Sequence, residues 1–216
     1  MENLTVEHLK IAASEFASNL SIRRVQEVVG ITDGKAVGTY IETAFKDYLR
    51  QFYYSNNWGN AASGVDLPTI NTDIKSTSIR QPQSSLPFKS ARQKLYGLGY
   101  NLLIFVYEKD DSQERNLIFK SVDFVYADHT GDFRLSKFVI DALESGAYRD
   151  DIFAIFEDLN LPGDEIVYNQ LIDEVMHCAP LQGYLTISNA LQWRAQYRRV
   201  IDVAGTVDGV EKIYGE

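Results

Sequence analysis

Apolar residues at intervals of three and four dominate the first fifty positions of the chain and predict helices. One stripe runs through residues 5–20 and another through residues 37–52. Residues 21–29 predict a short helix between them, which Gly30 ends, and residues 30–34 predict a turn. The N-terminal part of the chain is therefore expected to form helices joined by short connections.

The pattern changes in the middle of the chain to short apolar or alternating runs, which are typical of strands. Residues 65–66 begin a strand or its edge, and residues 70–79 alternate as a second strand. Residues 100–107 are almost continuously apolar, as expected of a central strand covered on both faces, and residues 117–126 follow as its hairpin partner. A helix is expected at residues 88–98, between the second strand and the central one.

Helical spacing returns in the C-terminal third of the chain. Helices are predicted at residues 133–143, 150–159, 164–177 and 187–203. Helices before, between and after the strands predict a mixed central β-sheet flanked by helices, which is an α/β fold class. A chain of 216 residues buries one substantial core, so we expect a single domain over residues 1–216.

The composition is that of an ordinary globular protein, with 45% hydrophobic and 24% charged residues. No apolar run approaches the ~20 residues that span a bilayer, and the start of the chain lacks the basic and apolar regions of a signal peptide, so no membrane association is expected. Cys178 is the only cysteine, which predicts a cytoplasmic location. One cysteine and three scattered histidines do not make a structural zinc site.

The net charge of −9 argues against a nucleic-acid partner, because binding to phosphates requires cations. The distribution of charge changes this picture. Residues 74–107 and 175–201 contain basic side chains and no acid, whereas acids are concentrated at residues 108–114 and 141–174. An acidic chain can therefore still present a basic groove, although ordinary variation of surface charge explains either segment alone.

The strongest candidate for chemistry lies in residues 64–75, where two acids and a lysine follow one another closely. Alternation along a strand places Asp73 and Lys75 on one face and Ile74 on the other, with Asp66 just upstream. Two carboxylates and an amine that converge can hold a divalent cation, a water molecule and a phosphate, which is the minimum for metal-assisted phosphodiester cleavage. The alternative is an exposed strand that carries a simple Asp–Lys ion pair.

These residues resemble the metal site of the PD-(D/E)xK nucleases, the superfamily of most type II restriction endonucleases. In that pattern an Asp at the end of one strand precedes (Asp/Glu)-x-Lys on the next strand, and Asp66, Asp73 and Lys75 match it. Val65 stands where the name of the pattern has proline. The short spacing is similar to that of the nicking endonuclease of methyl-directed mismatch repair, and residues 34–42, Gly-Lys-Ala-Val-Gly-Thr-Tyr-Ile-Glu, resemble its approach to a helix with a glutamate.

The resemblance implies a role for each residue of the site. Asp66, Asp73 and the backbone carbonyl of Ile74 are expected to ligate Mg²⁺, a hard cation that prefers oxygen ligands. Lys75 is expected to position and help deprotonate the attacking water, or to stabilise the charged transition state. Glu42 either holds a second metal, directly or through water, or is a surface acid of its helix; the two interpretations are equally well supported.

Polar and basic side chains that follow the catalytic strand are candidates for contacts with DNA. Amide, hydroxyl and guanidinium groups suit base edges or phosphates, and here they are carried by Arg80, Gln81, Gln83, Ser84 and Ser85. The helix predicted at residues 88–98 adds Lys89, Arg92 and Lys94. Its closeness to the site favours phosphate contact over a merely solvated basic face.

A second candidate for contact with DNA is the helix predicted near the C-terminus, within residues 186–199. Amides suit adenine and guanidinium groups suit guanine, and the candidates at helical spacing or beside it are Asn189, Gln192, Arg194, Gln196 and Arg199. A helix that enters a DNA groove and a packing helix anchored by Leu191 and Trp193 explain this pattern equally well.

The function that the resemblance implies is Mg²⁺-dependent, sequence-specific hydrolysis of double-stranded DNA by a type II restriction endonuclease. The resemblance covers a core of about residues 34–126, with a helical C-terminal region at about residues 132–216 as a candidate DNA-recognition element. Palindromic sites are read by symmetric dimers, so a homodimer is expected. Two alternatives remain: a monomeric nicking or repair nuclease of the same fold, and a non-catalytic DNA-binding regulator that uses the C-terminal helix.

Overall fold

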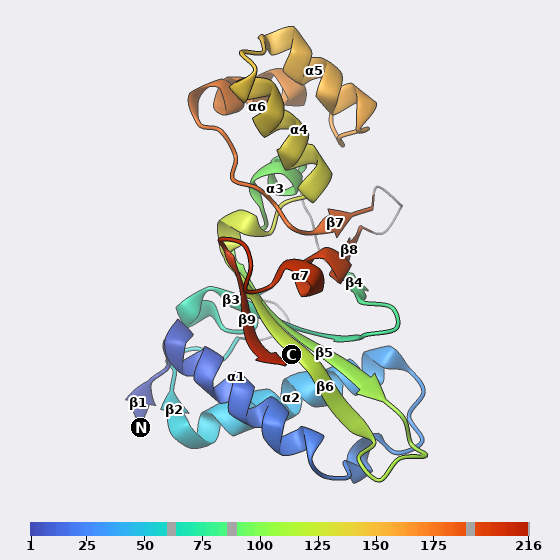
Figure 1. Cartoon of the computed structure of the whole chain (residues 1–216). Coiled ribbons are helices and arrows are strands. Elements are labelled where there is room, and N and C mark those ends of the chain that lie inside the picture. The colour runs from blue at the N-terminus through green and yellow to red at the C-terminus, as the bar shows by residue number, and fades with distance from the viewer. Residues whose placement is uncertain (60–63, 86–89, 189–192, 216) are drawn as a thin grey trace.

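The structure, a computed structural model, describes residues 1–59, 64–85, 90–188 and 193–215. Helices α1 (Val6–Ser21) and α2 (Gly34–Phe52) lie with a four-stranded sheet at one end of the molecule, and helices α4 (Phe133–Glu144), α5 (Arg149–Asp158) and α6 (Glu165–His177) lie at the other (Figure 1). Helices α3 (Ala91–Tyr96) and α7 (Arg198–Val203) and a small second sheet lie between these ends (Figure 1).

The large sheet is mixed, as the sequence predicts. Its strand order is β3 (Thr72–Ser78), β5 (Asn101–Lys109), β6 (Leu117–Val125) and β9 (Val210–Gly215). Strands β3 and β5 are parallel, whereas β5–β6 and β6–β9 are antiparallel. Strand β5 is fully buried from Leu102 to Val106, which explains its continuous apolar run. Strand β3 is an edge strand, so one side of its backbone is available to other parts of the chain.

Helices α1 and α2 cover one face of this sheet. Thr5 caps α1 and Asp33 caps α2, each by accepting hydrogen bonds from the first turn. The apolar stripes predicted for both helices meet the sheet in an aromatic cluster, in which Phe16, Phe45 and Phe105 pack with ring centroids 4.9–5.8 Å apart. Aromatic burial of this kind contributes strongly to stability and fixes α1 and α2 against β5, the neighbour of β3.

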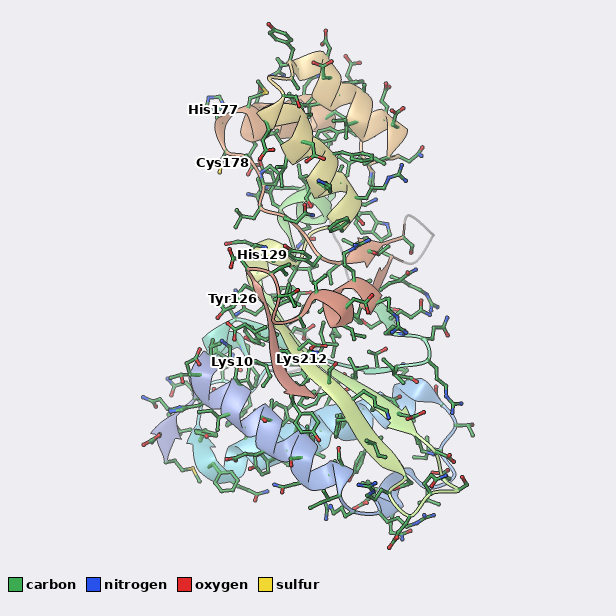
Figure 2. The ribbon with its side chains drawn as sticks, viewed as in Figure 1. Lys10, Tyr126, His129, His177, Cys178 and Lys212 are labelled. Carbon is green, nitrogen blue, oxygen red and sulfur yellow. The ribbon has the colours of Figure 1, made fainter. Side chains whose placement is uncertain are left out.

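A salt-bridge cluster joins α1 to the far edge of the sheet. The ammonium of Lys10 lies 2.8 Å from a carboxylate oxygen of Glu211 in β9 and donates a hydrogen bond of 2.9 Å to the hydroxyl of Tyr126 (Figure 2). The pKa of Lys10 is raised, because these hydrogen bonds outweigh the burial that opposes its charge. The cluster ties the C-terminal strand to the N-terminal helix.

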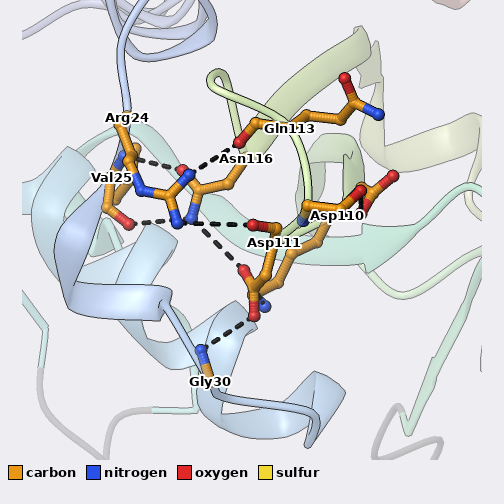
Figure 3. A network of polar contacts seen from close by, with 9 residues as sticks. Arg24, Val25, Gly30, Asp110, Asp111, Gln113 and Asn116 are labelled. Atoms are coloured by element: carbon orange, nitrogen blue, oxygen red, sulfur yellow. Dashed lines mark hydrogen bonds and ion pairs between the residues drawn. The ribbon is translucent and has the colours of Figure 1, made fainter.

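The turn between β5 and β6 is tied to the segment that precedes α2. Asn116 is fully buried and exchanges two hydrogen bonds with the backbone of Val25, of 2.8 and 3.0 Å (Figure 3). A carboxylate oxygen of Asp111 accepts a hydrogen bond of 2.8 Å from the N–H of Gly30, and Arg24 donates to the carbonyl of Gln113 (Figure 3). These bonds fix where the chain enters α2.

The opposite face of the large sheet carries a second core, and the remote helices form a third. Tyr197 and Val200 pack on the second face against Leu102 and Ile104. A three-stranded sheet of β4 (Gln83–Ser85), β8 (Arg194–Gln196) and β7 (Thr186–Ile187) lies beside this core. Helices α3 to α6 surround the third core.

The remaining elements are short. Strands β1 (Glu2–Asn3) and β2 (Tyr53–Tyr54) form a parallel pair. Single 3-10 turns lie at Gln26–Val28, Pro68–Ile70 and Ala127–His129. Among the described residues there is no helix long and apolar enough to cross a membrane.

Three predictions of elements are wrong, and strands β1, β2, β4 and β9 were not predicted. Residues 21–29 contain only a 3-10 turn, and residues 65–66 are a bend rather than a strand. The helix predicted at residues 187–203 is instead strands β7 and β8 followed by the short α7, because burial there has a period of two. Strand β9 was missed because its residues alternate weakly and lie on an edge.

Candidate active site

A tight turn brings Asp66 back alongside the outer edge of β3. The backbones of Leu67 and Thr72 exchange hydrogen bonds of 2.9 and 3.2 Å across the 3-10 turn, and Asn71 closes the turn in the left-handed conformation, with φ 47°. The N–H of Ile74 then donates a hydrogen bond of 3.0 Å to a carboxylate oxygen of Asp66. Residues that are eight positions apart are therefore in direct contact.

Asp73 and Lys75 lie on one face of β3, as alternation predicts. Their side chains form an ion pair of 2.6 Å, and the N–H of Asp66 donates a hydrogen bond of 3.3 Å to the other carboxylate oxygen of Asp73. Ile74 points the other way and is fully buried in the core beneath α1 and α2. The burial of Ile74 thus sets the register that presents Asp73, which is only 4% exposed.

Helix α2 adds two charged side chains one turn apart. The ammonium of Lys46 lies 2.5 Å from the carboxylate oxygen of Asp66 that does not contact Ile74. Glu42, four residues earlier, faces the same charges, since Asp66, Asp73 and Lys75 all influence its pKa. Lys46 was not among the candidates from the sequence. Its spacing of four from Glu42 on one helix face is the signal that could have identified it.

The acids of this cluster differ in how readily they ionise. Burial raises the pKa of Asp73 to about 6, and Asp66 adds to this effect while Lys75 opposes it. Burial also raises the pKa of Glu42 to about 7, with further contributions from Asp66 and Asp73 against Lys75 and Lys46. For Asp66 burial acts in the same direction, but its hydrogen bonds with Asp73, Lys46 and Ile74 lower its pKa below the usual value.

The donor atoms at this edge fit a hard divalent cation. Asp66 and Asp73 supply carboxylate oxygens, and two lysines now provide the positive charge that offsets them. The N–H and C=O of one strand residue point to the same side, so the carbonyl of Ile74 also faces the outer edge where Asp66 lies. Over the described ranges, no three His, Cys, Asp or Glu side chains form a ready-made metal cluster, so Glu42 lies near the pair without completing a trio.

Two tyrosines border the acids, and the sequence did not point to either. Tyr197 is fully buried, and its hydroxyl is hydrogen-bonded to that of Ser84. Its pKa is raised by burial and by the charges of Asp73 and Glu42. The hydroxyl of Tyr100 is buried without a hydrogen-bond partner in the described part of the chain, and its pKa is raised by burial, Asp73 and Asp66.

The candidates for DNA contact that follow β3 are placed around strand β4. Arg80 and Gln81 are exposed in the turn that leaves β3. Gln83 and Ser85 lie on one face of β4, whereas Ser84 points to the interior and contacts Tyr197. Only part of this stretch is therefore presented to a ligand.

The basic side chains of α3 have partners within the protein. Arg92 donates bidentate hydrogen bonds to Glu174 of α6 and lies over the ring of Tyr96. Lys94 is buried, and burial lowers its pKa against the opposing charge of Asp132. The phosphate contacts expected of Arg92 and Lys94 stay a prediction, although both side chains already interact within the protein, and Lys89 lies outside the described residues.

The candidates from residues 186–199 are not carried by a helix. Asn189 and Gln192 lie outside the described residues. Arg194 and Gln196 are exposed on β8, and the guanidinium of Arg199 stacks at 3.6 Å over the ring of Phe133. The groove-entering helix is thus replaced by a strand with an exposed polar face.

Comparison with known proteins connects this site to one family. A family model described as type II restriction enzyme NspV matches residues 3–212. The curated type II restriction enzyme NspV of Nostoc sp. (strain PCC 7524) is 49% identical over 217 residues, which covers 99% of this chain and 98% of that protein. No solved structure matches the chain significantly.

Proposed function

Because the chain belongs to the family of the type II restriction enzyme NspV, we propose that it cuts double-stranded DNA at a specific sequence by metal-assisted hydrolysis. The observation that carries this proposal is the convergence of Asp66, Asp73 and Lys75 at the outer edge of β3. A buried ion pair at a sheet edge, with a second acid hydrogen-bonded to it, is unusual as a purely structural feature. It is well suited to a reaction in which negative charge develops.

The cation that suits this donor set is Mg²⁺. Asp66, Asp73 and the carbonyl of Ile74 would hold it, with Glu42 contributing directly or through water. When bound, a divalent cation neutralises phosphate oxygens and makes water more acidic. The raised pKa of Asp73 and of Glu42 supports this assignment. It means that the charged carboxylates are unfavourable in this site, and a bound cation would favour their charged forms.

The two lysines have separate roles in this mechanism. Lys75 is paired with Asp73 at the site, so its ammonium is placed to orient the water that attacks phosphorus and to offset the negative charge of the transition state. Lys46 holds Asp66 in place from α2 and is a positioning residue. Water adds to phosphorus as the bond between phosphorus and the leaving oxygen breaks. The water gives up one proton to solvent, and the leaving oxygen takes one up from solvent.

We place the core of the nuclease at about residues 34–126 within one domain of 216 residues, with the region after residue 132 contributing to DNA recognition. A homodimer is the assembly that a symmetric DNA site would require. Action on DNA inside the cell supports a cytoplasmic location. The exposed Cys178 is compatible with a reducing compartment.

Incubation of the purified protein with supercoiled plasmid in MgCl₂, with and without EDTA, tests this function. The expected product is linear DNA with defined ends, formed only when the metal is available. Open circles alone would indicate the monomeric nicking enzyme. Binding without hydrolysis would indicate the non-catalytic regulator and overturn the proposal.

A further inference from the structure

Two segments that are about 110 positions apart in the sequence form one sheet. Strand β4 pairs antiparallel with β8, which places Gln83 opposite Gln196 and Ser85 opposite Arg194. Strand β7 extends the sheet on the other side of β8, with Thr186 opposite Gln196. The two stretches that lack acidic residues, 74–107 and 175–201, therefore meet in this sheet.

The sheet has one apolar face and one polar face. Ile187 and Ala195 point inward and are buried, and Ser84 joins them by bonding to Tyr197. Their neighbours point outward: Thr186, Arg194, Gln196 and Ser85 are exposed, and Gln83 is half-buried. We define the outward face by Gln83, Ser85, Thr186, Arg194 and Gln196.

Hydrogen-bonding groups on the outward face are unused. No hydrogen bond or ion pair joins the side chains of Gln83, Arg194 or Gln196 to another residue in the ranges that the structure describes. An amide can form two hydrogen bonds with adenine and a guanidinium two with guanine in the major groove, and a β-ribbon fits that groove. Paired amides beside an arginine thus suit base edges better than phosphates alone.

This sheet is fixed to the catalytic strand. The N–H of Gln83 donates a hydrogen bond of 2.9 Å to the hydroxyl of Thr77, which lies two residues after Lys75 and on the same face. The N–H of Tyr197 donates one of 2.8 Å to the carbonyl of Pro82. The outward face is therefore held at a fixed position relative to Asp73 and Lys75. An enzyme that cuts at a fixed distance from the bases it reads requires such a connection.

We propose that the outward face of the β4–β8–β7 sheet is the base-reading surface of this enzyme and enters the major groove of the duplex that it cuts. Gln83 and Gln196 read adenine, and Arg194 reads guanine. This inference rests on the proposed nuclease function and specifies how that function selects its sequence.

Cleavage of a library of randomised duplexes in MgCl₂, followed by sequencing of the cut ends, tests this surface. The test variants are Gln83→Ala, Arg194→Ala and Gln196→Ala, and the matched controls are Gln170→Ala in α6 and Arg115→Ala before β6, both exposed. Each glutamine variant should lose discrimination about 5- to 150-fold at an A·T pair, and Arg194→Ala at a G·C pair. The controls should keep the wild-type preference.

If a variant no longer cuts, its substitution is combined with Lys75→Ala, and the duplexes that the double variant binds from the same library are sequenced. This measures sequence preference in binding separately from cleavage. A loss of preference at one base pair supports the inference, and an unchanged preference in all three variants overturns it. If the wild-type protein cuts no duplex at all, the proposed function itself has failed. If it cuts with full specificity in every variant, only the reading surface is wrong.

Discussion

The proposed catalytic edge of β3 and the outward face of the β4–β8–β7 sheet differ in how their polar side chains are paired. At the edge, Asp66 and Asp73 both have partners: Asp66 contacts Lys46 and Ile74, and Asp73 contacts Lys75 and Asp66. On the outward face, the side chains of Arg194 and Gln196 are exposed and have no hydrogen-bond or ion-pair partner within the described residues. The two acids of the first region are paired and largely shielded from solvent, whereas Arg194 and Gln196 of the second carry exposed side chains.

This difference matches what the two proposed roles, catalysis and base recognition, require of their polar groups. Catalysis depends on charges that are already in place when the transition state forms, so the protein orients them in advance. Recognition depends on hydrogen bonds that only the correct bases complete, so the protein leaves those donors and acceptors free. Substitutions at the edge of β3 are therefore expected to have larger effects than substitutions beside the outward face.

Lys75→Ala should have the largest effect. Removal of the ammonium that pairs with Asp73 should lower the rate of DNA cleavage by about 10²- to 10⁴-fold, because both the orientation of water and the stabilisation of charge are lost. Plasmid cleavage measures the rate, and a gel-shift assay should show that DNA binding persists. Lys137→Ala, which removes an exposed ion pair of α4, is the control, and an equal loss in both variants would contradict the assignment.

Lys46→Met should destabilise the metal-free protein. Asp66 and Asp73 then lose one of the two charges that offset them, which should lower the free energy of unfolding by about 1–2 kcal/mol in EDTA. Urea denaturation measures this loss. Addition of MgCl₂ should stabilise the variant more than the wild type, because a cation replaces the missing charge. Identical unfolding of both proteins in EDTA would show that Lys46 does not balance the site.

Asp73→Asn should flatten the pH dependence of stability in EDTA. Asp73 binds its proton more tightly in the folded chain, where its pKa is about 6, than in the unfolded chain, so its stabilisation is present at low pH and is lost as pH rises through 6. Between pH 4.5 and 7.5 the wild type should lose on the order of 1–3 kcal/mol more than the variant.

The comparison with the variant is necessary because buried Asp123, with its pKa raised to about 7 by burial, and Glu42 contribute the same trend to both proteins. Denaturation curves at several pH values measure the slopes. Parallel slopes in the wild type and the variant would mean that the pKa of Asp73 is not raised in the folded protein.

Tyr197→Phe should have the smallest effect and sharpens the comparison at the point where the two regions meet. Loss of the hydrogen bond to Ser84 should cost about 1 kcal/mol in stability and reduce sequence discrimination by a few-fold, since the sheet becomes less firmly held. KM and kcat on correct and single-mismatch duplexes measure this. Tyr148→Phe, at an exposed tyrosine, is the control, and a large fall in kcat without a change in discrimination would argue for a direct role in chemistry.

The convergence of Asp66, Asp73 and Lys75 could be predicted from the sequence because its determinants are local. Asp73, Ile74 and Lys75 are consecutive, and the alternation of a strand is enough to separate their faces. Asp66 returns by a tight turn within eight residues. Lys46 was not assigned from the sequence: its spacing of four from Glu42 was a usable signal, but its ion pair with Asp66 depends on how α2 packs on β3.

The β4–β8–β7 sheet could not be predicted, because it forms between segments that are far apart in the chain. Residues 187–203 contain apolar positions that fit a helix and a strand equally well over a short window, and the pairing with β4 decides the outcome. Burial of Ala195 and Tyr197 beside exposed Arg194 and Gln196 is visible only in the folded structure. Long-range pairing therefore determined the element that the pattern left ambiguous.

The most direct measurement of the central claim is plasmid cleavage by Asp73→Ala in MgCl₂, with folding confirmed by thermal denaturation. If Asp66 and Asp73 hold the cation at the edge of β3, the variant should remain folded, retain DNA and leave the plasmid supercoiled under conditions in which the wild type produces linear DNA. Cleavage by Asp73→Ala at a rate close to that of the wild type would contradict the account.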